Sequence, residues 1–142
     1  MTYCGKLGFA ALMLVGLAVP SYADGGPTGT WIMENGKVTV KISPCGPNLC
    51  GTIVALKKPL DKSGKPKVDK ENPNASLRNR PIIGITVLSN MVPQSDNKWA
   101  GKIYNADDGY TYTSYMKLNG DTIKVKGCFG PFCKSMQFKR VN

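Results

Sequence analysis

The fold class is decided by the stretch YTYTSYMKLNGDTIKVK, residues 110–126. Polar and apolar side chains alternate on both sides of Asn119-Gly120, which is typical of β-strands with one buried face. One face carries Tyr110, Tyr112, Ser114, Met116 and Leu118, and after the turn Ile123 and Val125 continue it. Asn-Gly favours a two-residue turn because both residues tolerate positive φ. The stretch therefore predicts an antiparallel hairpin with its lysines facing solvent.

The same period of two recurs along the chain, and no window has a convincing helical stripe. We expect strands at 30–34, 37–43, 50–56, 82–88, 99–105, 110–118, 121–126 and 134–141. Most of them are joined by tight turns such as Asn35-Gly36. About eight short antiparallel strands predict an all-β fold, either an up-and-down β-barrel or a curved sandwich. A barrel of this size has an interior that is filled by side chains or holds one small ligand.

Composition limits the function. The chain has 142 residues, 42% of them hydrophobic and 20% charged, which fits one globular domain. It has no histidine, so Ser-His and Cys-His catalytic pairs and imidazole metal ligands are excluded. We accordingly expect no metal and no cofactor.

The first residues have the pattern of a secretory signal peptide. A basic start ending at Lys6 precedes the apolar run 7–19, and Ser21-Tyr22-Ala23 provides a small-x-small cleavage site. A retained transmembrane helix is the alternative, but a span needs about 20 apolar residues. We expect cleavage after Ala23, leaving residues 24–142 as a single β-barrel domain without a transmembrane segment. The mature chain would be exported to the periplasm or the medium, with a net charge of about +9.

Cleavage would remove Cys4 and leave Cys45, Cys50, Cys128 and Cys133. An even number of cysteines in an exported chain favours disulfides. Four cysteines allow three pairings, and the sequence alone does not choose among them. We favour the two local C-x4-C bridges, because crossed bridges would need both turns at the same end of the fold. A zinc site is the alternative, although C-x4-C matches zinc spacing only loosely.

The long segment 57–81 interrupts the series of tight turns. A loop of this length inside a compact domain is often functional, and Asn72-Pro73 predicts a short helical turn at 74–77. Arg78 and Arg80, two apart on an extended segment, would point to one side and grip a carboxylate or phosphate. Alternatively, Asp69 and Asn72 pair with these arginines and hold the loop on the barrel.

Gly29-x-Trp31 opens the first expected strand and Arg140 lies on the last. If the barrel closes by pairing its ends, Arg140 can stack over the indole of Trp31 in a cation–π contact. This pair is expected to close the barrel structurally. The arrangement resembles the signature of lipocalins and their calycin relatives.

A longer series of motifs resembles the domain-of-unknown-function 2147 family of small exported bacterial proteins. In order they are Gly29-Thr30-Trp31, Pro44-Cys45-Gly46, Leu49-Cys50-Gly51, Asp69, Asn72-Pro73, Leu77-Arg78-Asn79-Arg80-Pro81, Gly84, Trp99-Ala100-Gly101-Lys102-Ile103-Tyr104, Gly109, Tyr112 and Arg140-Val141. The resemblance implies a lipocalin-like β-barrel in the cell envelope or outside it, without an established activity. The chain departs from the family pattern at Asn105-Ala106, at Phe138 and in its additional pair Cys128 and Cys133.

Three functional hypotheses follow. The first is a protein that binds a small apolar or amphipathic, lipid-like ligand in the barrel mouth through Arg78, Arg80, Trp99, Tyr110, Tyr112 and Met116. The second is an interaction protein whose basic surface binds anionic lipid or another anionic envelope polymer. The third is an enzyme acting at Asp69, Arg78 and Arg80. Nucleic acid is a poor partner, because the basic residues do not cluster with aromatic ones.

Overall fold

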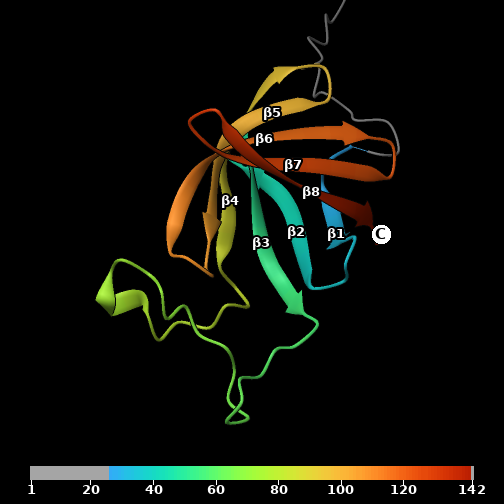
Figure 1. Ribbon diagram of the computed structural model, residues 1–142. Coiled ribbons are helices and arrows are strands. Elements are labelled where there is room, and N and C mark those ends of the chain that lie inside the picture. Colours follow the sequence, from blue (N-terminus) through green and yellow to red (C-terminus); the bar gives the residue numbers. More distant parts are fainter. Residues whose placement is uncertain (1–25, 142) are drawn as a thin grey trace, which may run out of the picture.

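The computed structural model describes residues 26–141, so the expected leader and its cleavage after Ala23 lie outside the described residues. Eight strands and one short 3₁₀ helix form the described part (Figure 1). Their bounds are β1 Gly29–Met33, β2 Val38–Cys45, β3 Asn48–Leu56, η1 Ala75–Leu77, β4 Thr86–Ser95, β5 Lys98–Asn105, β6 Tyr110–Asn119, β7 Thr122–Phe129 and β8 Phe132–Arg140. Within the described range, no helix is long and apolar enough to cross a membrane.

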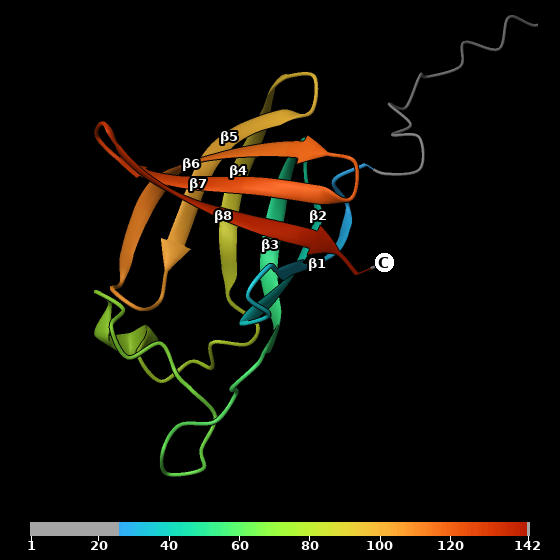
Figure 2. The same ribbon diagram turned by 45° about the vertical axis from the view of Figure 1, so that its right-hand side comes forward.

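The strands form a closed antiparallel barrel in sequence order. Each strand pairs with its neighbours along the chain, and β1 pairs with β8 to complete the circle. The up-and-down barrel expected from the sequence is therefore confirmed. In an up-and-down barrel, successive connections alternate between the two ends of the strands. Figure 2 shows the β3–β4 connection below the barrel and the β7–β8 turn protruding at the upper left. We call the end with the β1–β2, β3–β4, β5–β6 and β7–β8 connections the open end, and the other the closed end.

A hydrophobic core fills the closed half of the barrel. Its buried side chains come from all around the sheet and include Trp31, Leu49, Met91, Trp99, Met116, Leu118 and Ile123. Each lies on the inward face of its strand because side chains alternate across the sheet. Large aromatic and methionine side chains therefore occupy the interior at this end and leave the interior toward the open end less filled.

The junction of β1 and β8 is held by Trp31 and Arg140, which are paired in register. The guanidinium lies 4.3 Å from the indole centroid, so the expected cation–π contact is present. The indole Nε1 donates to Pro27 O at 2.9 Å, while Arg140 donates to the carbonyl oxygens of Gly26 and Thr28. The pair thus joins the first and last strands and also fixes the segment that enters the barrel.

The fourth strand differs from its expected position. A strand was predicted at 82–88, but β4 runs from Thr86 to Ser95 and the chain turns at Asn97, whose φ is 60°. The register of β4 against β5 shifts between Ser89 and Val92, and Asn90 has a φ of 49°. This bulge breaks the period of two that the prediction used. Gly101 faces the bulge, and a Cβ there would lie 2.5 Å from Asn90 O.

Both local disulfides are present. Cys45 bonds to Cys50 across the β2–β3 turn, and Cys128 bonds to Cys133 across the β7–β8 turn. The barrel topology explains this pairing, because the two turns lie at opposite ends and crossed bridges would have to span the barrel. All four sulfurs are occupied in these bonds, which argues against the zinc alternative.

The role of the Trp31–Arg140 junction can be measured directly. Replacing Arg140→Gln should lower the free energy of unfolding by about 2 kcal/mol, because a cation–π contact and charge-assisted hydrogen bonds are lost together. Urea unfolding followed by tryptophan fluorescence checks this value. Lys139→Gln is the matched control, since Lys139 is exposed on the same strand. Equal midpoints for the two variants would contradict a structural role of the pair.

Candidate functional site

The open end of the barrel leads into a cavity of about 1350 Å³. Sites for drug-sized ligands usually have volumes of about 300–1,000 Å³, so a small amphiphile fits within it. The deep wall is apolar and is contributed by β2, β3, β4, β5, β7 and β8. It consists of Val40, Ile53, Val87, Leu88, Ile103, Val125, Met136 and Phe138. Chemically, such a wall suits a hydrocarbon chain or ring system.

The rim of the cavity is polar and mainly basic. It carries the exposed side chains of Lys37, Lys57, Lys58, Lys67 and Lys134, together with Glu34, Asp107 and Asp108. Among the described residues, the only ion pairs are Arg80–Asp69 and Arg140–Asp121, so the rim lysines take part in none. An apolar interior below unpaired cations is the arrangement expected for a ligand with a hydrophobic body and an anionic head.

The β5–β6 turn forms one side of this rim. The Tyr112 hydroxyl donates to Asp108 Oδ2, and Asp108 Oδ1 accepts from the Tyr110 amide at 2.9 Å. Asn105 Oδ1 accepts from the Asp107 amide at 2.9 Å. The hydrogen bond to the Asp108 carboxylate raises the pKa of Tyr112. The turn acids therefore shape the rim through local hydrogen bonds, as side-chain-capped turns do.

Asp69 anchors the long loop 57–81 beside the open end. Its side chain is fully buried and accepts hydrogen bonds from Tyr104 Oη at 2.6 Å, Asn72 Nδ2 at 2.8 Å and Arg80 Nε at 2.9 Å. Burial acts to raise the pKa of the Asp69 carboxyl, but these hydrogen bonds outweigh it and the pKa lies below its ordinary value. Burial and the bond to Asp69 raise the pKa of Tyr104. The carboxylate is thus kept charged by donors from the loop and from β5.

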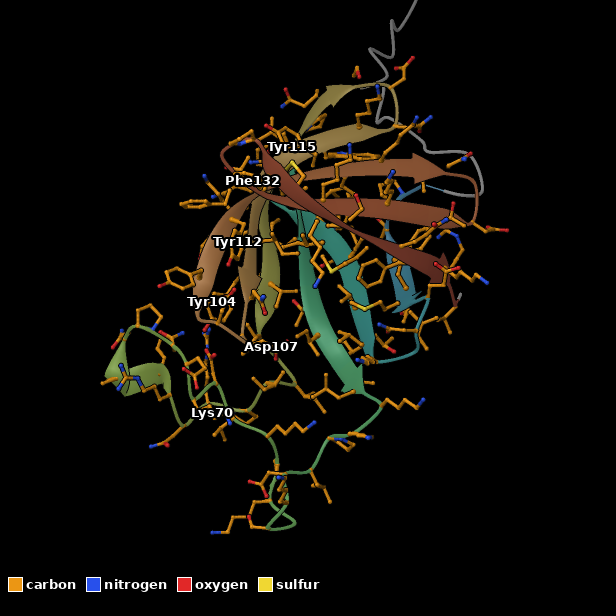
Figure 3. The ribbon with its side chains drawn as sticks, viewed as in Figure 1. Lys70, Tyr104, Asp107, Tyr112, Tyr115 and Phe132 are labelled. Carbon is orange, nitrogen blue, oxygen red and sulfur yellow. A yellow bond between two sulfur atoms is a disulfide. The ribbon has the colours of Figure 1, made fainter. Side chains whose placement is uncertain are left out.

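A second contact fixes the same loop against the β5–β6 turn. Gly109 has a φ of 76°, and a Cβ there would lie only 2.0 Å from Glu71 O. Only glycine allows the turn and the loop backbone to approach this closely. The loop also pairs with itself at Val68 and Pro81, which closes its second half around Asp69. Figure 3 shows Lys70 on this loop near Tyr104 and Asp107.

The structure distributes the six expected ligand residues over different places. Tyr112 borders the cavity. Trp99 and Met116 point inward as expected, but they belong to the hydrophobic core and not to the cavity wall. Tyr110 starts β6 at the open end, where it is 67% exposed and does not border the cavity, although its ring centroid lies 6.4 Å from that of Tyr112.

The predicted anion grip of Arg78 and Arg80 is not formed. The segment is not extended: Arg78 caps η1 in a right-handed helical conformation, so the two side chains do not share a direction. Arg78 Nε donates to Asn72 O at 2.7 Å, while Arg80 pairs with Asp69 and lies over the Tyr104 ring at 5.7 Å. Neither arginine borders the cavity. These contacts match the alternative in which the arginines hold the loop, and the helical turn at 75–77 is confirmed.

The hypothesis of an enzyme at this loop gains no support from the geometry. The Asp69 carboxylate has no exposed surface and already accepts three hydrogen bonds. A general acid or base must reach the substrate within hydrogen-bond distance. Asp69 and its partners are therefore best described as the anchor of the loop.

Sequence reasoning missed the rim lysines as a group. They come from the β1–β2 and β3–β4 connections and from β8, and only barrel closure brings them to one end. The available signal was the parity of the connections, since odd-numbered strands of an up-and-down barrel all end at the same side. The alternation of polar and apolar residues also predicted neither the bulge in β4 nor the length of the β7–β8 hairpin.

An eight-stranded up-and-down barrel with an apolar interior open at one end defines the molecule as a lipocalin-like β-barrel. More specifically, the chain belongs to the DUF2147 family, described as "Uncharacterized protein conserved in bacteria", whose family model matches residues 29–140. The resemblance expected from the sequence motifs is thereby confirmed over the whole barrel.

A solved structure supports the same fold. The chain is similar to a Helicobacter pylori protein described as "Protein HP1028 from the human pathogen Helicobacter pylori belongs to the lipocalin family". The two are 25% identical with a TM-score of 0.68, and the match covers 81% of this chain and 82% of the other. No curated protein sequence matches the chain significantly.

The anchoring role of Asp69 predicts a local effect. Asp69→Asn keeps the shape of the side chain but removes the charge opposite Arg80, which should cost about 2 kcal/mol of loop stability. Limited trypsin digestion should then cut after Lys70 and Arg78 about ten times faster or more. Glu71→Gln is the control, because Glu71 is an exposed acid in the same loop. Equal cleavage rates for both variants would contradict the anchor.

The lowered pKa of Asp69 also predicts a pH dependence. The Asp69 carboxylate binds a proton less readily in the folded loop than in the unfolded chain. Its full contribution to the stability of the loop is therefore present above the ordinary pKa of 3.8. It is lost as the pH falls through the lower folded value. In an NMR titration from about pH 7 to pH 2, loop amide signals should stay constant until about pH 4 and then change. Asp69→Asn should remove this transition, and a transition unaffected by the substitution would assign it to another group.

Proposed function

We propose that this protein binds a small amphipathic ligand, with an apolar body and an anionic head group, in the cavity at the open end of the barrel. The observation that carries the proposal is the cavity of about 1350 Å³ with its apolar wall. A filled interior would have left no room for a ligand of the usual size. The fold family adds support, because the similar Helicobacter pylori structure is described as a lipocalin.

The head group is inferred from the charges at the mouth. Five lysines and three acids border the cavity, and none of these side chains forms an ion pair with another described residue. The excess of positive charge favours a carboxylate, phosphate or sulfate group at the rim while the apolar part is buried below. This assignment replaces Arg78 and Arg80 by the rim lysines as the residues that contact the head group.

The proposed place of action is the periplasm or the surrounding medium. Two disulfides are consistent with export, because such bonds persist in oxidising compartments. The signal-peptide pattern of residues 1–23 supports the same location. A free amphiphile has a low solubility in these aqueous compartments, so a barrel that binds it would keep it in solution.

The proposal is tested by filling the cavity. Met136 borders the cavity and is only partly buried, so Met136→Trp can place an indole in the ligand volume. Binding of a fluorescent fatty acid should weaken by about tenfold or more, since a bulky group competes for the same space. Tyr115→Trp adds the same residue to an exposed outward position and should bind like the wild type. Fluorescence titration checks both affinities.

The head group is tested with the same probe. Replacing Lys37 and Lys134 by Gln should weaken the fatty acid by about tenfold but should leave its methyl ester unaffected, because only the acid carries a charge. Native mass spectrometry of the purified protein would identify a retained natural ligand. The absence of probe binding to the wild type, or equal binding by Met136→Trp, would overturn the proposed function.

A further inference from the structure

The tip of the β7–β8 hairpin exposes two large aromatic side chains. This tip loop comprises Cys128–Phe129–Gly130–Pro131–Phe132–Cys133. Phe129 and Phe132 face each other in register, and their side chains are 77% and 78% exposed. They are the two most exposed large hydrophobic side chains of the described residues. Exposed apolar surface of this kind marks an interaction site in a folded protein.

The exposure is built into a well-defined turn. The Cys128–Cys133 disulfide closes the base of the tip loop, and the strand ladder continues to the Phe129–Phe132 pair. Gly130 has a φ of 57°, which completes a two-residue turn with Pro131. The two phenylalanines therefore protrude together from a cross-linked apex.

Positive charge lies immediately behind this apex. From Thr122 to Arg140, β7 and β8 carry Lys124, Lys126, Lys134, Lys139 and Arg140 and no acidic residue. Lys126 and Lys134 are closest to the tip, each within three residues of a phenylalanine, and both are exposed. Neither belongs to an ion pair between described residues. The hairpin is thus apolar at its end and cationic just below it.

The tip loop also borders the mouth of the cavity. Phe129, Phe132 and Lys134 are part of its boundary, together with Tyr112 of the adjacent strand. Figure 3 shows Phe132 on the side of the barrel away from the long loop, and Tyr112 between it and the β5–β6 turn. Whatever the tip contacts is therefore brought next to the cavity entrance.

We propose that the tip loop docks the protein on an anionic lipid bilayer, with Phe129 and Phe132 inserted among the lipids and Lys126 and Lys134 against the head groups. A bilayer is favoured over a protein partner because apolar and cationic groups follow one another with depth, as in a membrane interface. A protruding apex also suits a fluid surface better than a preformed pocket. Docking does not require a ligand in the cavity, but it places the cavity entrance next to the bilayer, which contains amphiphiles.

The test is binding of the mature protein to sedimented vesicles. The wild type should bind phosphatidylcholine vesicles containing about 30% phosphatidylglycerol more tightly than pure phosphatidylcholine, and about 0.5 M salt should weaken this binding. The double substitution Phe129→Ser and Phe132→Ser should reduce the affinity for the anionic vesicles by about tenfold or more. Replacing Lys126 and Lys134 by Gln should give a similar loss at low salt and little further loss at high salt.

Matched variants separate the tip from other surfaces. Leu60→Ser removes another exposed large apolar side chain, on the long β3–β4 connection that lies away from the tip loop in Figures 1 and 2, and should bind vesicles like the wild type. Phe132→Trp should show blue-shifted emission and quenching by brominated lipid. Urea unfolding must give the double phenylalanine variant a midpoint near that of the wild type; if it does not, the single Phe132→Ser variant replaces it in the comparison.

The outcomes are distinct from those of the ligand proposal. Met136→Trp, which fills the cavity, should still bind vesicles, so loss of fatty-acid binding with retained docking supports both proposals. Undiminished vesicle binding by the phenylalanine variants would overturn the docking proposal. So would absence of wild-type binding, or a tip-dependent dimer in analytical ultracentrifugation, which would assign the tip to a second copy of the chain.

Discussion

The barrel depends on the pairing of its first and last strands. β1 is the shortest strand, and only a few residue pairs join it to β8, so a side-chain contact at this point has a large effect. Arg140 supplies that contact by covering the indole of Trp31 and donating to the entering backbone at Gly26 and Thr28. Without closure, both strands would present unpaired edges and the interior would open to water along its length. The cavity is therefore a consequence of this junction.

The two ends of the barrel differ because the side chains facing inward differ in size. Tryptophan and methionine side chains pack the closed half. Toward the open end, Gly127 occupies an inward position and borders the cavity. A larger residue at Gly127 would meet Ile103 and Tyr112. Small residues in the wall thus preserve volume where a ligand needs it, and the packed half provides the stability that an open interior does not.

The sequence predicted those features that depend on alternation along one strand or on local turns. The strands, the 3₁₀ turn and the local disulfides follow from such patterns. It failed where a distant contact decides, as at the β4 bulge opposite Gly101. It also failed at Arg78, which ends the 3₁₀ turn capped by Asn74 and whose side chain donates to the Asn72 carbonyl. It also could not distinguish inward residues that fill the core, such as Trp99, from those that border a cavity, because both have the same period.

One hairpin links the closure, the cavity and the exposed tip. β8 ends at Arg140, which closes the barrel, and its middle contributes Met136 and Phe138 to the cavity wall. Its start carries Phe132 beyond the wall, held by the disulfide to β7. These residues are separated by even numbers of positions, so they lie on the same face of β8. The exposed tip, the cavity wall and the junction are therefore parts of one strand, whereas the Cys45–Cys50 turn lies at the closed end.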